Sequence, residues 1–344
     1  MRTKTFVSLL LAAVLLLIAA AAVYFFVSSG GGDENAGPDS VNLPKIRAIV
    51  EEKVISPIFS ENGDLVWFMI GSKLYRQRTD GSVPKEEIVL PEAVIGVTGV
   101  IWPMEGENFL IEQNLDGHVR YLSFDSFNDR FVEFDSAIRN PRFLPTGDKV
   151  VYDRLTSTGG HELKIADADG NNFAKVGDLF RPDYDFAVSP NGHELAAWST
   201  SSLTPSPFFL VDLFTGKFDQ LGEAGFYRGA KFSPDGSKLL VSKNNQSGVA
   251  ALALYELSSR VLTNIGLFGE IDQVSWSGDG AEIFLPGALG LLRYRPATAE
   301  VKEVFRFPEG NALRVERLQV HPSKTFVVLV ASGSGFLYRV DISQ

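Results

Sequence analysis

The chain has 344 residues, 45% of them hydrophobic, and a formal net charge of −10. This acidic balance argues against a general nucleic-acid binder, because affinity for phosphates depends on clustered lysine and arginine. The absence of cysteine excludes disulfides, thiolate metal sites and cysteine nucleophiles.

The N-terminus carries an uncharged apolar run over residues 6–27, preceded by Arg2 and Lys4. At about 1.5 Å per residue a helix of this length covers roughly 33 Å, enough to span a membrane. The preceding positive charge predicts that residues 1–5 are cytoplasmic and that the rest lies outside a bacterial cytoplasmic membrane, periplasmic or extracellular. A cleaved signal peptide is the alternative, since small residues follow a shorter apolar core. Residues 28–43, rich in glycine and polar residues, are expected to form a flexible linker.

A short turn motif recurs through residues 44–344. Its copies read FSENG, WPMEG, FLPTG, VSPNG, FSPDG and WSGDG, with a seventh, degenerate copy, VHPSK. Their last residues are 41 to 45 positions apart, and short apolar runs follow each turn. Four short strands per repeat of about 40–45 residues is the period of a propeller blade. We therefore predict an all-β, seven-bladed β-propeller over residues 44–344.

The ends of the repeat region predict how the ring closes. The seventh repeat stops after its third strand, whereas residues 44–50 lie at the distance before the first turn that fourth strands occupy elsewhere. We expect this N-terminal segment to complete the last blade, because pairing would protect a strand edge that is otherwise exposed.

The FSPDG motif and its copies resemble the TolB-type propeller repeat, a relative of the WD-repeat class. The third copy, residues 143–172, is especially similar, with the turn, the second strand and a third strand ending in Asp-Gly. The resemblance implies the fold and says little about function, since such repeats occur in scaffolds, receptors and propellers attached to peptidases. TolB itself has six blades and a separate α/β domain, so its role in the Tol system is not implied.

Known catalytic motifs are missing from the sequence: it has no G-x-S-x-G, H-E-x-x-H, Walker A or dinucleotide fingerprint. The histidines lie at unequal distances from their turns, which disfavours a shared metal centre. We interpret them as surface or turn residues: His118, His161, His193 and His321. No catalytic residue, metal or cofactor is predicted.

Basic and aromatic residues gather where the chain reaches the innermost strands of blades 3 to 7. They are Arg139, Arg142, Arg181, Tyr184, Tyr227, Arg228, Lys231, Arg314 and Arg317. We predict that they form a ring at the channel mouth able to bind a carboxylate, a peptide terminus or a sugar phosphate. The competing interpretation is local pairing with acidic residues of the same segments: Asp183, Asp185, Asp272 and Glu316.

The leading functional hypothesis is a non-catalytic binding or scaffold module of the cell envelope. We expect a monomeric propeller, anchored by its N-terminal helix, whose partner is an envelope protein or peptide, or an anionic ligand. The alternative is a propeller-type hydrolase or lyase with its active site at the channel mouth, using the four acidic residues. A sensor acting with a neighbouring protein would have the same sequence features as the scaffold.

Overall fold

The computed structural model describes residues 45–342 except 61, 92–93, 201–203, 246 and 309–312. The predicted membrane helix and linker, residues 6–27 and 28–43, lie outside this part of the chain and stay predictions. Among the described residues no helix has the length and apolar character needed to cross a membrane.

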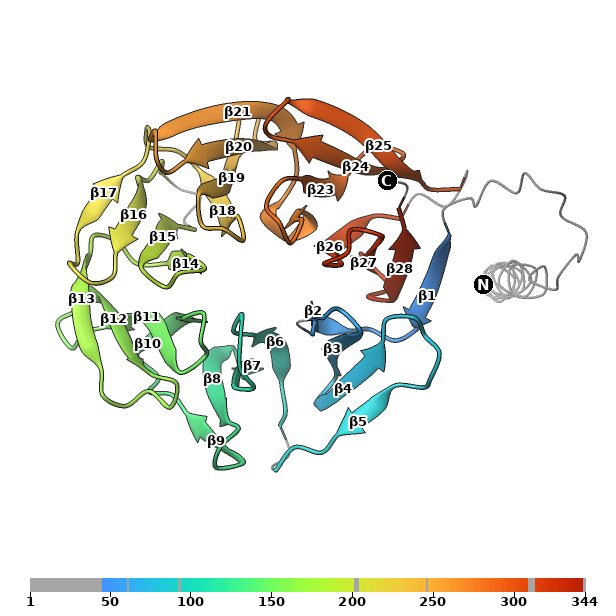
Figure 1. Ribbon diagram of the computed structural model, residues 1–344. Coiled ribbons are helices and arrows are strands. Elements are labelled where there is room, and N and C mark those ends of the chain that lie inside the picture. The colour runs from blue at the N-terminus through green and yellow to red at the C-terminus, as the bar shows by residue number, and fades with distance from the viewer. Residues whose placement is uncertain are drawn as a thin grey trace, which may run out of the picture. The chain divides into compact units, whose positions relative to one another are not determined.

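The described residues form seven four-stranded antiparallel sheets arranged as blades around a central axis (Figure 1). The seven-bladed propeller is thus confirmed. Blades 1 to 3 consist of β2 (Ile55–Phe59), β3 (Leu65–Ile70), β4 (Lys73–Arg78) and β5 (Glu86–Ile88); β6 (Val97–Ile101), β7 (Phe109–Leu115), β8 (His118–Asp125) and β9 (Arg130–Glu133); and β10 (Ile138–Phe143), β11 (Lys149–Leu155), β12 (His161–Asp167) and β13 (Ala174–Leu179).

Blades 4 to 6 repeat this order from the innermost to the outermost strand. They consist of β14 (Tyr184–Val188), β15 (Glu194–Ser199), β16 (Phe208–Asp212) and β17 (Phe218–Gln220); β18 (Tyr227–Phe232), β19 (Lys238–Asn244), β20 (Ala250–Glu256) and β21 (Val261–Phe268); and β22 (Ser275–Trp276), β23 (Ile283–Pro286), β24 (Gly290–Arg295) and β25 (Glu300–Arg306). One 3₁₀ turn, η1 (Ile271–Gln273), connects β21 to β22.

The last blade is closed as predicted by the N-terminal strand. It contains β26 (Val315–Val320), β27 (Phe326–Ala331), β28 (Leu337–Asp341) and, outermost, β1 (Ile46–Val50). Strand β1 pairs antiparallel with β28, with Ile46 opposite Val340.

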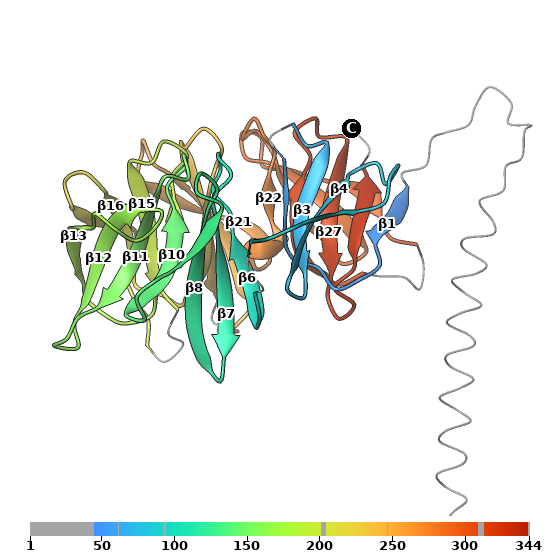
Figure 2. The ribbon, with the colours of Figure 1, turned by 90° about the horizontal axis from the view of Figure 1, so that it is seen from below.

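The strands of each blade run between two faces of the propeller (Figure 2). The mouth face carries the connections from a fourth strand to the next first strand and from second to third strands. The turn face carries the recurring motif and the connections from third to fourth strands. At a motif turn, Gly236 has φ +70° and its N–H donates to the Ser233 carbonyl at 2.8 Å. The degenerate seventh copy keeps this geometry without glycine, because Lys324 adopts φ +58° and donates to the His321 carbonyl at 2.8 Å.

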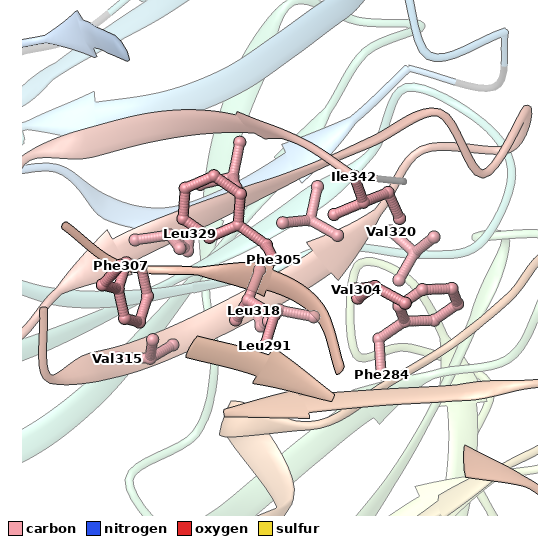
Figure 3. Packing of buried hydrophobic residues seen from close by; sticks show 12 residues of the cluster. Phe284, Leu291, Val304, Phe305, Phe307, Val315, Leu318, Val320, Leu329 and Ile342 are labelled. Carbon is pink, nitrogen blue, oxygen red and sulfur yellow. The ribbon is translucent and has the colours of Figure 1, made fainter. Parts of the chain in front are cut away.

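Apolar side chains fill each junction between neighbouring blades. In the described part of the chain there are seven clusters of buried hydrophobic residues, one per junction. Figure 3 shows the cluster between blades 6 and 7, where Phe284 and Phe305 pack toward Leu318 and Leu329. Strand alternation turns one set of side chains of every sheet toward the next blade, so the core is distributed around the ring.

Candidate functional site

Equivalent positions on the innermost strands hold polar side chains that join neighbouring blades. Arg142, Lys231 and Gln319 each stand five residues before the last residue of their motif turn. Arg142 Nε donates to the Phe186 carbonyl at 3.3 Å, and Lys231 Nζ donates to the Val274 carbonyl at 2.7 Å. Gln319 Nε2 donates in the same way between blades 7 and 1, to the Pro57 carbonyl at 3.0 Å.

Through these contacts Arg142 and Lys231 connect neighbouring blades. The Arg142 guanidinium also forms an ion pair with the Asp185 carboxylate of blade 4. Lys231 donates a second hydrogen bond, to the Ile271 carbonyl at 3.2 Å, and burial lowers the pKa of its amine. Pairing with an acidic residue, the competing interpretation, therefore describes Arg142, whereas Lys231 is held by backbone carbonyls.

The other predicted cations differ in their partners. Arg181 donates to the Thr204 hydroxyl at 2.9 Å, and Arg228 lies 3.6 Å from the Glu270 carboxylate. Arg314 and Arg317 have no hydrogen-bond or ion-pair partner for their side chains among residues 45–342 as described. Within the described ranges, Arg139 donates only to backbone carbonyls, that of Ile138 at 2.9 Å and that of Ser136.

The two predicted tyrosines do not belong to the channel mouth. Tyr184 is 0% exposed and Tyr227 is 4% exposed, and both rings pack in hydrophobic clusters between blades. Alternation along β14 and β18 turns these rings away from the axis, since bulky apolar surface is more stable between the sheets. The prediction that these two tyrosines line the channel mouth is therefore wrong.

The burial of Tyr227 predicts a loss of stability at alkaline pH. Its hydroxyl donates to the Glu223 carbonyl at 2.6 Å, and burial raises its pKa from 10.0 to about 12. The folded state then favours the neutral phenol. The resulting stabilisation is complete below pH 10 and is lost as the pH rises toward 12, by up to about 3 kcal/mol. We expect Tyr227→Phe to flatten the decline of the urea-unfolding free energy over this interval, and an unchanged decline would contradict the assignment.

A histidine held by a buried carboxylate lies at the mouth end of blade 3. His161 Nδ1 is 2.8 Å from both Asp153 carboxylate oxygens. The Asp153 residue is 0% exposed, whereas the His161 side chain is 15% exposed. His161 Nε2 has no hydrogen-bond partner in the described part of the chain. The ring nitrogen remote from the carboxylate is therefore the one available to a substrate.

Two further charged groups influence this pair. Arg139 stands directly opposite Asp153 in the β10–β11 ladder, which places both side chains on one face of the sheet. Burial raises the pKa of the Asp153 carboxyl, while His161 and Arg139 lower it and Asp183 raises it. Asp183, at φ +63°, enters β14 on the mouth face, and its carbonyl accepts hydrogen bonds from the Thr200 amide and hydroxyl.

The sequence interpretation of His161 as a surface or turn residue is therefore wrong. A signal was present: Asp153 interrupts the apolar strand VVYDRL, and His161 returns on the other side of a short connection. Hairpin register pairs Leu155 with His161, so that alternation places Asp153 and His161 on the same face. The expected register of this hairpin, taken together with the repeat period, is sufficient to identify the pair.

Comparison with known proteins supports the fold and changes the functional hypothesis. No family model matches the sequence. An oligogalacturonate lyase from Vibrio parahaemolyticus is similar with a TM-score of 0.66 and 10% identity, over 90% of this chain and 96% of that one. An oligogalacturonate lyase in complex with manganese gives 0.65 and 10%, with the same coverage. The Cps50 (Swd1) β-propeller domain of Myceliophteria thermophila gives 0.61 and 12%, over 87% and 100%.

These similarities confirm a WD40-like propeller fold, and no finding supports the TolB-type family specifically. They also overturn the leading hypothesis of a non-catalytic scaffold. Two of the similar structures are lyases built on this architecture, which favours the alternative of a propeller enzyme. Because identity is only 10%, the likeness itself establishes the fold alone, and an activity has to be argued from the site.

The manganese complex raises the question whether this chain holds a metal. The described residues contain no group of three or more His, Asp or Glu side chains placed to hold an ion. At the mouth of blade 3, both Asp153 oxygens and His161 Nδ1 already face one another. The residues present do not fit a metal site, and the mechanism proposed below uses none.

Proposed function

We propose that this propeller is a lyase that cleaves uronate-containing oligosaccharides at the mouth face, between blades 3 and 4. The observation that carries the proposal is the His161–Asp153 pair, with Nε2 of the imidazole unbonded and Arg139 opposite the carboxylate. The similarity to oligogalacturonate lyases suggests the substrate class.

The pair supplies the base that an elimination needs. His161 Nε2 takes the proton from the sugar carbon next to the carboxylate, and Asp153 orients the ring and stabilises the imidazolium that forms. The electrons of the broken C–H bond form a carbon–carbon double bond, and the neighbouring C–O bond breaks. The departing glycosidic oxygen takes a proton from water, and the imidazolium gives its proton to the hydroxide that remains, so that one chain becomes two.

Arg139 is the group placed to bind the substrate carboxylate. Its side chain has no carboxylate partner in the described part of the chain and donates only to two backbone carbonyls. Negative charge develops on the uronate carboxylate as the proton leaves, and a guanidinium beside it stabilises that charge more in the transition state than in the ground state.

Elimination fits the site better than hydrolysis. A glycosidase needs two carboxyl groups on either side of the glycosidic bond, one of them acting on the sugar carbon or on water. Both oxygens of Asp153 face the His161 ring, so this carboxylate is not free for such a role.

The test compares two substrates that differ only in the carboxylate. The purified protein is incubated with oligogalacturonate and with the same oligosaccharide after reduction of its carboxyl groups to alcohols. We expect ultraviolet absorbance from the new double bond with oligogalacturonate and none with the reduced substrate. New reducing ends without that absorbance would indicate hydrolysis, and no cleavage of either substrate would refute the proposal.

A further inference from the structure

A second polar site lies on the turn face, between blades 6 and 7, away from the His161–Asp153 pair. It is a cavity of about 260 Å³. Its lining residues come from the motif turns and strands of both blades: Glu282, Phe284, Arg293, Arg295, Ser323, Lys324 and Ile342. A water molecule takes up about 30 Å³ of liquid, so the cavity has room for a small ligand.

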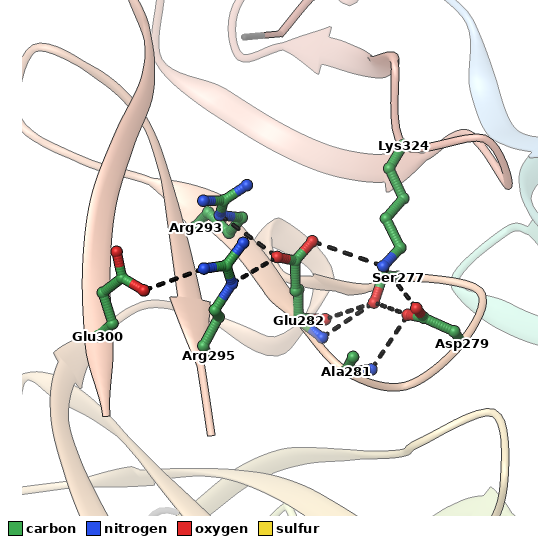
Figure 4. Close-up of polar contacts among 8 residues, drawn as sticks. All are labelled: Ser277, Asp279, Ala281, Glu282, Arg293, Arg295, Glu300 and Lys324. Atoms are coloured by element: carbon green, nitrogen blue, oxygen red, sulfur yellow. Dashed lines mark hydrogen bonds and ion pairs between the residues drawn. The ribbon is translucent and has the colours of Figure 1, made fainter. Parts of the chain in front are cut away.

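One buried carboxylate organises three cations around this cavity (Figure 4). Glu282 is 6% exposed and lies 2.8 Å from Arg295 Nε, 3.4 Å from Arg293 Nε and 3.7 Å from Lys324 Nζ. The lining groups thus carry three positive charges against one negative charge. Outside the lining, Asp279 lies 2.5 Å from Lys324 Nζ and Glu300 lies 3.1 Å from Arg295 Nη1, which leaves Arg293 as the cation with no second carboxylate.

The state of Arg293 indicates what the cavity binds. The residue is only 7% exposed, and its Nε lies 3.4 Å from a Glu282 carboxylate oxygen. In the described part of the chain its two terminal nitrogens, Nη1 and Nη2, have no hydrogen-bond partner. These nitrogens are free to donate into the cavity, and a guanidinium is suited to an oxyanion that accepts two parallel hydrogen bonds.

We propose that this cavity binds a small phosphate-bearing anion through Arg293, with Arg295 and Lys324 supplying the remaining positive charge. Glu282 holds the three cations apart and in place. The observation that carries the assignment is Arg293, 7% exposed and with no hydrogen bond from its terminal nitrogens among the described residues, in the wall of a cavity lined by three cations and one carboxylate.

Isothermal titration with inorganic phosphate tests the proposal, in chloride buffer of constant ionic strength. We expect saturable binding at one site, and at least tenfold weaker binding in Arg293→Gln. Lys324→Gln should weaken binding by a smaller factor, about threefold. Arg306→Gln is the matched control, because Arg306 pairs with Glu303 on β25 and does not line the cavity. Acetate should bind more weakly than phosphate.

A second variant guards against misfolding. Arg293→Gln removes one of the three positive charges near the Glu282 carboxylate. The double variant Glu282→Gln/Arg293→Gln removes one charge of each sign and should therefore fold. It should still bind phosphate at least tenfold more weakly than the unaltered protein. No phosphate binding by the unaltered protein, equal affinity in Arg293→Gln, or equal affinity for acetate would each overturn the proposal. His161→Gln should bind phosphate normally, which separates this result from that of the lyase assay.

Discussion

Replacing His161 by glutamine is expected to lower kcat on oligogalacturonate by two to four orders of magnitude. Glutamine retains a polar side chain next to Asp153 but has no basic nitrogen to accept the substrate proton, and general-base catalysis contributes about 10²–10⁴ in rate. The measurement is the initial rate of double-bond formation, with circular dichroism confirming the fold. His193→Gln is the matched control, because His193 lies on the turn face against the Phe214 ring.

The role of Asp153 can be separated from that of His161 by the pH profile. Asp153 contacts the histidine, so we assign it as a positioning residue. Asp153→Asn should lower kcat with little change in KM and should shift the pH dependence of kcat, because the carboxylate no longer stabilises the imidazolium. Normal turnover by His161→Gln, or an unchanged pH profile in Asp153→Asn, would contradict the proposed mechanism.

Removing the closing strand is expected to destabilise the propeller by at least about 4 kcal/mol. Deletion of residues 45–50 withdraws Val50 and Ile49 from the cluster between blades 7 and 1, and Ile46 from the cluster between blades 6 and 7. Each fully buried aliphatic side chain contributes about 1.5–3 kcal/mol, and the deletion also exposes the edge of β28. Urea unfolding of the deletion variant measures the loss.

Two substitutions within β1 show whether burial causes this effect. Val50→Asp places an unpaired carboxylate in the cluster between blades 7 and 1, where Val50 is 4% exposed, and should destabilise strongly. Arg47→Ala changes an exposed position of the same strand and should be nearly neutral. If the deletion and Val50→Asp both unfold at the urea concentration of the unaltered protein, strand exchange does not stabilise the ring.

The candidate site was predictable in part. Basic residues were expected at the starts of the innermost strands; Arg139 is the second residue of β10, whereas Arg142 lies near the end of that strand. Their partners were not predictable from local sequence, since Arg142 pairs with Asp185 on the next blade, 43 positions away. Bulges in β10, β18 and β26 also shift the register near the mouth, which decides the direction in which each side chain points.

The sequence by itself determined the seven blades and the way in which the ring closes. Proline, glycine and polar side chains specify each motif turn within five residues, and strand alternation is equally local, so both are visible without a structure. The tertiary structure alone decided which polar groups form hydrogen bonds within the fold and which remain available to a ligand or substrate. It directs Arg142 and Lys231 to carbonyls of the next blade, and it places Arg293 in a cavity wall with no partner for its terminal nitrogens among the residues that the structure describes. Such partners are set by packing between blades, and hydrogen bonds between residues more than forty positions apart leave no pattern within a single repeat.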